Sequence, residues 1–262
     1  MKKLGIIGFG VMGGAMAAAV RAHMPDIPIM VFDSKKEKLA QLPSRLSLSP
    51  AENTEELVRD CDVCMLCIKP QDLPGLASEI RAASHGKRFI SILAGKSTAT
   101  LASALDTQEI ARFMPNLAAI TGKSTVGVAF HQASSAAHRE ECLSVAKMLG
   151  AAHEIPERLM AAMTGISGSG IAYVLSFMHA LSQGGVAAGF DYATALKIAI
   201  GTVEGAVSLL EEGTHPMELV SRVTSPAGTT IQGIRVLEKA GMTAAVMEAV
   251  EAAARRAQEL EG

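Results

Sequence analysis

The first stretch of the chain alternates short apolar runs with segments of helical periodicity. Runs such as Ile29–Phe32 and Val63–Ile68 are bounded by polar or turn residues, a pattern typical of buried strands. The predicted strands span 4–8, 29–32, a short one near 45–48, 63–68, 89–93, 109–114 and 125–130, and the predicted helices span 12–23, 36–42, a short one capped by Asn53, 73–83, 99–105 and 135–149. This alternation predicts an α/β fold with a mostly parallel, doubly wound sheet covered by helices.

The pattern changes after about Ile155, where the strand signals stop. Helical periodicity runs through residues 160–188, 192–212, 230–240 and 242–260, and Gly184-Gly185, Gly213 and Gly241 fall where helices are expected to end. The sequence therefore predicts two domains. Residues 1–154 form the α/β domain and residues 155–262 form an all-helical domain.

Charge and composition narrow the class of protein. Lys plus Arg number 24 against 26 Asp plus Glu, so the net charge of −2 gives no reason to expect nucleic acid or an anionic membrane as a partner. Polar residues interrupt the apolar segment 165–190, and glycines interrupt the Ala-rich N-terminal run, which argues against a membrane span and a signal peptide. We expect a cytoplasmic protein. The absence of Trp and the 14 Met suggest close helix packing and a subunit interface.

Three cysteines recur at intervals of three, which suggests a metal site at first sight. Cys64 and Cys67 lie on a predicted strand, however, where residues three apart point to opposite faces and cannot converge on one ion. We therefore expect buried free thiols, a reducing compartment and no metal.

The strongest motif is a glycine-rich turn between the first predicted strand and the first helix. It consists of Gly8, Phe9, Gly10, Val11, Met12 and Gly13, a G-x-G-x-x-G sequence. Its glycines permit a tight turn, a close approach of the backbone to a pyrophosphate, and close packing of helix on strand. Free N–H groups at the helix start then favour the phosphates. The context predicts dinucleotide binding in a Rossmann-type domain.

The residues after the second strand leave the choice of dinucleotide open. Asp33 is placed to accept hydrogen bonds from a ribose, which favours NAD. Ser34, Lys35 and Lys36 suit a 2′-phosphate, which favours NADP.

Three further turns follow predicted strands, at the edge where α/β sheets bind their ligands. They contain Lys69-Pro70, Ala94-Gly95 and Met114-Pro115-Asn116. We expect Lys69, Pro70, Ala94, Gly95 and Asn116 to line the cofactor site.

The helical stretch carries two motifs of its own. Gly165 to Tyr173 is rich in small residues that allow close packing, and Thr224 to Thr230 places four hydroxyls around Gly228 just before a predicted helix. Hydroxyls and free N–H groups at a helix start favour an anion, so we expect this loop to hold a carboxylate.

Taken in order, these motifs resemble the pyrroline-5-carboxylate reductase family. The resemblance runs from about residue 3 to residue 260, and the Ser225-Pro226-Ala227-Gly228-Thr229-Thr230 element is its most specific part. Two positions depart from the family pattern. Ile171 replaces a proline, and Ala227 replaces a glycine, which would strain the loop if that position has positive φ.

The resemblance implies a function and a set of residues. It implies reduction of 1-pyrroline-5-carboxylate to L-proline, the last step of proline biosynthesis, with NADPH as the usual hydride donor and NADH as an alternative. The cofactor site would include Gly8 to Met12, Ser34, Asn53, Lys69, Pro70, Ala94 and Asn116, and the substrate site would include Ser225, Gly228, Thr229 and Thr230. Thr230 is expected to hydrogen-bond the ring nitrogen. The resemblance further implies that the helical domain forms a homodimer, and that such dimers can assemble into a ring.

Alternative functions remain at this point. A β-hydroxyacid dehydrogenase would need a catalytic Lys where Val174 stands, so this alternative is disfavoured. An imine reductase with another substrate, or a nucleotide sensor without catalysis, would preserve the same glycine motif. No histidine is convincing as a catalyst, and His179 on an apolar helix is expected to be a core or interface residue.

Overall fold

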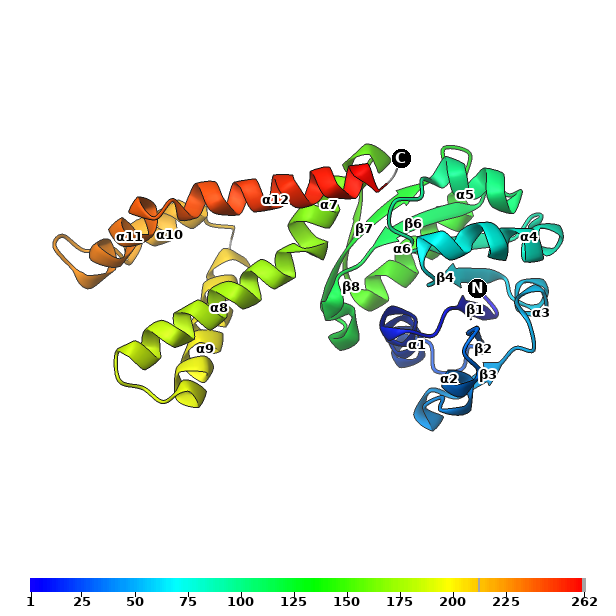
Figure 1. The fold of residues 1–262 in the computed structure, drawn as a ribbon, viewed down its shortest axis with the longest axis horizontal. Coiled ribbons are helices and arrows are strands. Elements are labelled where there is room, and N and C mark those ends of the chain that lie inside the picture. Colours follow the sequence, from blue (N-terminus) through cyan, green and yellow to red (C-terminus); the bar gives the residue numbers. More distant parts are fainter. Residues whose placement is uncertain (212, 261–262) are drawn as a thin grey trace. The chain divides into compact units, whose positions relative to one another are not determined.

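The computed structural model describes residues 1–211 and 213–260, and the first part of the chain builds a single sheet. Its strands are β1 (Leu4–Ile7), β2 (Ile29–Phe32), β3 (Leu48–Pro50), β4 (Val63–Leu66), β5 (Arg88–Ser91), β6 (Ile110–Met114), β7 (Ser124–Phe130) and β8 (Gly150–Glu154). They lie in the order β3-β2-β1-β4-β5-β6-β7-β8, and all neighbours are parallel except β6 and β7 (Figure 1). The order β3-β2-β1-β4-β5-β6 is that of the Rossmann fold, so the predicted fold class is confirmed.

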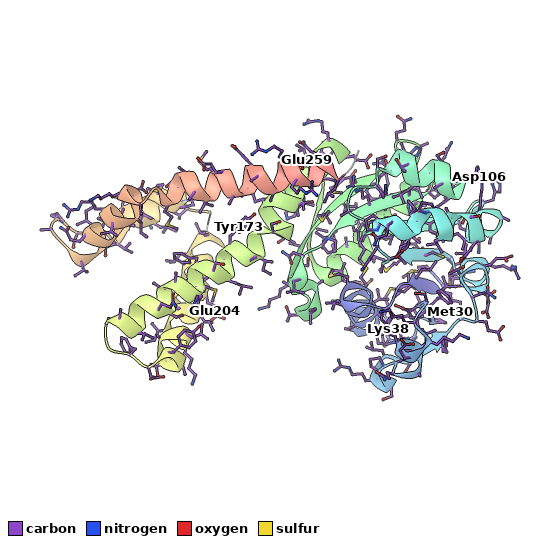
Figure 2. All side chains as sticks on the ribbon, in the orientation of Figure 1. Met30, Lys38, Asp106, Tyr173, Glu204 and Glu259 are labelled. Carbon is purple, nitrogen blue, oxygen red and sulfur yellow. The ribbon has the colours of Figure 1, made fainter. Side chains whose placement is uncertain are left out.

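Helices cover both faces of the sheet. One apolar cluster packs α1 (Val11–His23) and α6 (Ala136–Leu149) against one face, where Met16 and Val145 are buried. A second cluster packs α3 (Thr54–Asp60), α4 (Leu73–Ser84) and α5 (Thr98–Leu105) against the other face. Side chains fill the space between the layers (Figure 2). The short helix α2 (Lys36–Ala40) and 3-10 turns at Ser44–Leu46, Pro70–Asp72 and Leu117–Thr121 complete this part.

Two predicted elements differ in detail from the observed ones, and one strand was missed. The strand predicted near 45–48 lies at Leu48–Pro50, after the 3-10 turn. The strand β8 was not predicted, because its residues Gly-Ala-Ala-His-Glu lack apolar alternation and are largely exposed. The strand exists because its backbone pairs with β7, and the approach at Gly150 is so close that a Cβ there would lie 2.0 Å from Ser124 O.

The chain after β8 is helical in the described residues. It contains the 3-10 turn η4 (Glu157–Leu159), α7 (Met160–Met163), a π-helical turn (Thr164–Gly168), α8 (Gly170–Ala187), α9 (Tyr192–Glu211), α10 (Pro216–Arg222), α11 (Thr229–Lys239) and α12 (Met242–Glu259). Two compact units result: residues 1–169 with the end of α12 from residue 252, and residues 170–251. The first unit thus continues beyond the last strand residue, Glu154, at which the predicted α/β domain ends.

Two features of the helical region were not predicted. Residues 160–187 are helical, as the periodicity predicted, but a π-helical turn interrupts them, a distortion common near functional sites. The helix α10 was missed because His215-Pro216 suggested only a turn, whereas Pro216 occupies the first helical position and His215 Nδ1 accepts a hydrogen bond of 3.2 Å from Met217 N. Glu212, the predicted last residue of the helix from Tyr192, lies outside the described residues, as do residues 261–262.

The second unit exposes much apolar surface. Within it, α8 packs on α9, and Tyr173 Oη donates a hydrogen bond of 3.1 Å to Ala249 O of α12 (Figure 2 labels Tyr173). Exposed apolar side chains on α8 and α9 include Leu175, Phe177 and Val207. Two helical segments, residues 157–187 and 192–210, are long and apolar enough to cross a membrane by length and composition, which is weak evidence by itself. An apolar helix face of this kind also suits a subunit interface.

Candidate functional site

The glycine-rich turn joins β1 to α1 at the point where the strand order reverses, between β1 and β4. Gly8 has φ of +96°, and a Cβ there would lie 2.5 Å from the backbone oxygen of Cys67 at the end of β4. A side chain at Gly13 would lie 2.1 Å from Gly8 O. These two positions therefore require glycine so that strand, turn and helix can pack together.

Gly10 has a different role from its neighbours in the turn. It is the N-cap residue of α1, has no side-chain capping bond and is exposed. Among the described residues, a Cβ at this position would meet no atom within 4 Å beyond Gly10 itself and the adjoining backbone. The next residue, Val11, is 66% exposed although it is apolar. An open, glycine-lined helix start of this kind fits a pyrophosphate.

The carboxylate of Asp33, which follows β2, is engaged by hydrogen bonds and an ion pair within the chain. Its carboxylate accepts hydrogen bonds from Phe9 N at 2.8 Å and Lys35 N at 3.0 Å, and pairs with Lys38 Nζ at 2.7 Å. Burial by itself would raise the pKa of Asp33, but the Lys38 ammonium and the two backbone N–H groups outweigh burial and hold the pKa below its usual value. Ser34, Lys35 and Lys36 are exposed beside it.

The other residues predicted for the cofactor site follow strands at the same edge. Asn53 follows β3 and caps α3 by accepting from Glu56 N at 2.8 Å, and Lys69 and Pro70 follow β4. Ala94 and Gly95 follow β5, where Ala94 is exposed and Gly95 is buried with φ of +69°. Because these strands are parallel, their carboxyl ends share one edge of the sheet.

Asn116 follows β6 at the same edge. Its Oδ1 accepts from Ala118 N at 3.1 Å, and its Nδ2 donates to Ser167 Oγ at 3.1 Å. Ser167 in turn donates to Thr125 O of β7, also at 3.1 Å. Asn116 therefore ties the π-helical turn to the sheet edge, a link that the sequence did not predict.

A carboxylate that sequence reasoning missed joins this edge to the segment after β8. Glu157 accepts two hydrogen bonds from Thr98, from the backbone N at 2.6 Å and from Oγ1 at 2.7 Å, and lies 3.4 Å from Arg112 Nη1. The only available signal in the sequence was a charged residue, Arg112, inside an otherwise apolar strand.

The predicted anion loop lies in the second unit, between α10 and α11. Gly228 is the N-cap residue of α11 and makes no side-chain capping bond, and Thr229 and Thr230 are its first two helical residues. The loop closes on itself through a bond of 3.1 Å from Gly228 N to Ser225 O. The structure thus brings Ser225, Gly228, Thr229 and Thr230 together around the start of α11. The first N–H groups of a helix have no acceptor within the helix, and the N-cap residue Gly228 supplies no side-chain acceptor.

Ala227 adopts φ of +57°, the conformation for which the sequence predicted strain. Gly228, the next residue, has negative φ, but a Cβ there would lie 2.3 Å from Ser225 Oγ. Glycine at position 228 therefore leaves room for the Ser225 hydroxyl in its observed position.

The cysteines lie in the two core layers. Cys61 and Cys64 belong to the cluster beneath α3 and α4, whereas Cys67 packs against the cluster beneath α1. Burial raises the pKa of the Cys61 thiol to about 11 and that of Cys67 to about 12. Among the described residues, no group of three His, Cys, Asp or Glu side chains is arranged to hold a metal ion.

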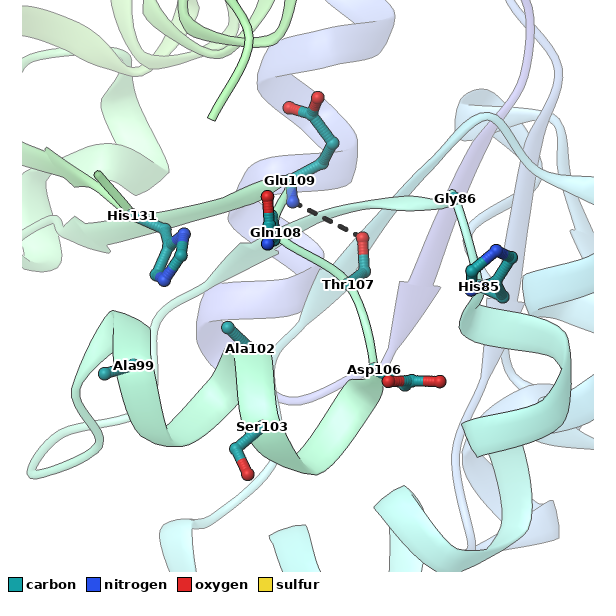
Figure 3. A pocket seen from close by; sticks show the side chains of 10 residues that line it. All are labelled: His85, Gly86, Ala99, Ala102, Ser103, Asp106, Thr107, Gln108, Glu109 and His131. Carbon is teal, nitrogen blue, oxygen red and sulfur yellow. Dashed lines mark hydrogen bonds between the residues drawn. The ribbon is translucent and has the colours of Figure 1, made fainter. Parts of the chain in front are cut away.

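One hollow of the first unit lies away from the carboxyl edge of the sheet. It has a volume of about 570 Å³ and is lined by residues that include His85, Asp106 and His131 (Figure 3). His85 precedes β5 and Gln108 precedes β6, so the hollow lies at the amino ends of these strands, the opposite edge from the glycine turn. It is not part of the predicted site.

A Rossmann sheet with a glycine-rich turn at its switch point, followed by a helical unit with a hydroxyl-bearing helix start, is typical of a dinucleotide-dependent oxidoreductase. Residues 157–260 match the model for pyrroline-5-carboxylate reductase dimerisation, and residues 3–95 match that for NADP oxidoreductase, coenzyme F420-dependent. Curated pyrroline-5-carboxylate reductases of Methanosarcina acetivorans and Synechocystis sp. are 38% and 37% identical; the matches cover 99% and 98% of this chain and 98% of each relative. The chain belongs to the pyrroline-5-carboxylate reductase family.

A solved structure agrees with this assignment. The crystal structure of pyrroline carboxylate reductase from Plasmodium falciparum with NADP bound is 26% identical and superposes with a TM-score of 0.89, over 99% of this chain and 98% of that one.

Proposed function

We propose that this protein reduces 1-pyrroline-5-carboxylate to L-proline with hydride from NADPH, the last step of proline biosynthesis. The observation that carries the proposal is the hydroxyl-bearing, uncapped start of α11 in a chain that also has a dinucleotide cradle. A carboxylate fits this helix start because its N–H groups and positive potential favour an anion. Full-length similarity to the reductases of the family supports the same substrate.

The cofactor is held by the carboxyl edge of the sheet in this proposal. Gly8 to Gly13 would hold the pyrophosphate, and Ser34, Lys35 and Asn53 would hold the adenosine half with its 2′-phosphate. Lys69, Pro70, Ala94, Gly95 and Asn116 line the remainder of the site. NADPH supplies the hydride when bound, and NADH is the alternative donor. The engagement of Asp33 with Phe9, Lys35 and Lys38 supports NADPH, because this carboxylate is already satisfied by the protein.

The loop before α11 orients the substrate. Ser225, Gly228 and Thr229 bind the carboxylate, and the Thr230 hydroxyl hydrogen-bonds the ring nitrogen. A protonated imine is electrophilic, so the residue beside its nitrogen needs to position and polarise the C=N bond and does not need to act as a strong acid. Hydride adds to the imine carbon and the nitrogen keeps its proton, which gives the secondary amine of proline.

Two features of the sequence, Val174 and the hydroxyl-rich loop before α11, disfavour the alternative functions. Alcohol oxidation requires a base to remove a hydroxyl proton, and Val174 stands where a β-hydroxyacid dehydrogenase would carry its Lys. A nucleotide sensor would have no use for the hydroxyl-rich loop. An imine reductase with another cyclic substrate shares the mechanism and is distinguished by assay.

We assign residues 1–154 to cofactor binding and residues 155–262 to substrate binding and dimerisation. The exposed apolar faces of α8 and α9 and the match to the dimerisation model support a homodimer through the helical part. The larger assembly that we propose is a ring of such dimers. Burial of these faces against a second copy removes the need for a lipid partner, so we propose a cytoplasmic enzyme.

Substitution of Thr230 tests the proposed function. Thr230→Ala removes the hydroxyl and is expected to lower kcat/KM by about tenfold to a thousandfold, the range for the loss of one polar stabiliser. Thr230→Ser keeps the hydroxyl and should retain most activity. Thr224→Ser is a matched control, because Thr224 Oγ1 donates to Val220 O at 2.7 Å and is not offered to the substrate. Equal activity of the Ala variant and the wild type would remove Thr230 from the mechanism.

A further inference from the structure

The loop 94–97, which follows β5, ends at Thr98, and Thr98 is hydrogen-bonded to the carboxylate of Glu157 from a distant part of the chain. Thr98 is the first residue of α5, and both of its hydrogen-bond donors, the backbone N and Oγ1, are bound by Glu157 at 2.6 and 2.7 Å. Thr98 is 3% exposed, so the two donors of these bonds are buried, whereas the Glu157 side chain is 30% exposed. A carboxylate at a helix start is also favoured by the helix dipole.

Glu157 is itself held by the sheet. Arg112 Nη1 lies 3.4 Å from Glu157 Oε1, and the Arg112 side chain is only 2% exposed. Arg112 pairs with Ser91 across β5 and β6 and stands two positions before Met114, which begins the Met-Pro-Asn turn. One carboxylate therefore connects the start of α5 to the strand that leads to the next ligand-binding turn.

The near end of the loop is fixed by the sheet as well. Ile92 N donates to Leu66 O of β4 at 3.2 Å, and Leu93 N donates to Ser91 Oγ at 3.2 Å. Between the two anchors lie Ala94, which is exposed, and Gly95, which has positive φ. The position of Ala94 and Gly95 at the carboxyl edge of the sheet is thus determined by the contacts of Thr98 on one side and by the hydrogen bonds of β5 on the other.

We propose that Glu157 is a positioning residue, which acts through Thr98 to set the 94–97 loop against the nicotinamide half of the cofactor. This inference rests on the proposed function, in which Ala94 and Gly95 line the cofactor site. Displacement of reacting groups by about 1 Å can cost a hundredfold in rate, so a loosened loop should affect hydride transfer more than binding of the adenine half.

The test separates the two halves of the cofactor. Glu157→Ala removes both bonds to Thr98 and should weaken NADPH binding several-fold in calorimetry. It should leave the affinity for 2′-phospho-ADP-ribose, which lacks the nicotinamide, at the wild-type value. Hydrogen exchange of the Thr98 amide should become faster. In turnover, kcat should fall by about tenfold to a hundredfold, and the primary isotope effect from deuterated NADPH should increase.

Matched variants separate positioning from general damage. Glu157→Gln can still accept from Thr98 N and donate to its Oγ1, so it should recover much of the lost affinity and rate. Glu154→Ala removes a neighbouring carboxylate that pairs with Arg139 at 3.1 Å and should behave as wild type. If Glu157→Ala does not fold, Thr98→Val, which loses the Oγ1 bond, is compared with Thr98→Ser, which keeps it.

Equal loss of affinity for NADPH and 2′-phospho-ADP-ribose, or no change in either, would overturn the proposal. A wild-type protein that fails to reduce 1-pyrroline-5-carboxylate would overturn the proposed substrate, whereas the two binding measurements and the exchange rate would still decide the role of Glu157.

Discussion

Asp33 Oδ2 lies 2.8 Å from the backbone nitrogen of Phe9, so the end of β2 holds the glycine-rich turn at the end of β1. The same oxygen pairs with Lys38 Nζ at 2.7 Å. In an NAD-binding domain an acidic residue at this position accepts hydrogen bonds from the ribose. Here the carboxylate stabilises the turn, and Lys38 compensates its charge.

The Asp33–Lys38 pair leads to a prediction about cofactor preference. Lys38→Gln leaves the Asp33 charge uncompensated beside the proposed 2′-phosphate site, so KM for NADPH should rise by about twofold to fivefold, the range for a partly exposed ion pair. KM for NADH should change less. Steady-state kinetics with both cofactors measures this, with Lys147→Gln at the end of α6 as control. An equal change for both cofactors would contradict the prediction.

The conformation of Ala227 predicts a gain from glycine. Ala227→Gly removes the strain of a left-handed Ala, about 1–2 kcal/mol, and part of this gain is offset by the greater freedom of glycine in the unfolded chain. The free energy of unfolding should therefore rise by up to about 1 kcal/mol, and KM for the imine acid should not increase. Denaturant titration measures the first quantity. A lower stability would show that Ala227 is not strained.

Gly228 gives the complementary test in the same loop. A methyl group at this position would overlap Ser225 Oγ, which can rotate away, so Gly228→Ala should displace the hydroxyl without unfolding the protein. We expect a higher KM for the imine acid at a nearly unchanged Tm. Unchanged kinetics would indicate that Ser225 does not bind the substrate.

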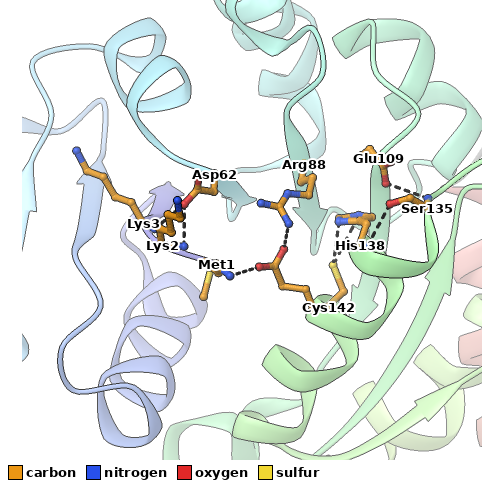
Figure 4. A network of polar contacts seen from close by, with 10 residues as sticks. Met1, Lys2, Lys3, Asp62, Arg88, Glu109, Ser135, His138 and Cys142 are labelled. Atoms are coloured by element: carbon orange, nitrogen blue, oxygen red, sulfur yellow. Dashed lines mark hydrogen bonds and ion pairs between the residues drawn. The ribbon is translucent and has the colours of Figure 1, made fainter.

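His138 predicts how stability depends on pH. It is fully buried in α6, beside Cys142 Sγ at 3.5 Å and the ring of Phe130, and forms part of the region shown in Figure 4. Burial lowers the pKa of His138 to about 4; nearby Glu109 opposes this shift and Arg88 adds to it. The unfolded chain therefore binds a proton below pH about 6.5 that the folded chain does not bind until pH about 4.

Stability should consequently be constant with respect to this group above pH about 6.5 and fall as the pH is lowered towards 4. The loss attributable to His138 is on the order of 3 kcal/mol. Denaturant titrations of the wild type and of His138→Phe at pH 7, 6 and 5 measure it. The variant should lose less stability than the wild type over this interval, and parallel curves for the two proteins would assign the dependence to other groups.

Local patterns were sufficient to predict most of the sheet and the glycine-rich turn that follows its first strand. The strand at Val63–Leu66 is a continuous apolar run, and the glycines at 8, 10 and 13 have fixed spacing, so both are visible in the sequence. The family's glycine at position 227 indicated that Ala227 would be strained if its φ were positive, and the structure shows that φ is +57°.

Features set by contacts between distant residues could not be predicted. The strand β8 depends on pairing with β7, and its exposed residues carry no apolar alternation. Glu157 and Thr98 are far apart along the chain, so neither residue type indicates the other. The engagement of Asp33 by Phe9 likewise follows from the way the turn folds back onto β2.

Oxidation of NADPH by the purified protein in the presence of 1-pyrroline-5-carboxylate, with identification of the product, tests the central claim most directly. The account predicts turnover that depends on the imine acid, a higher kcat/KM with NADPH than with NADH, and L-proline as the product. Binding of NADPH without turnover of this substrate would contradict the claim and would favour another cyclic imine or a nucleotide sensor.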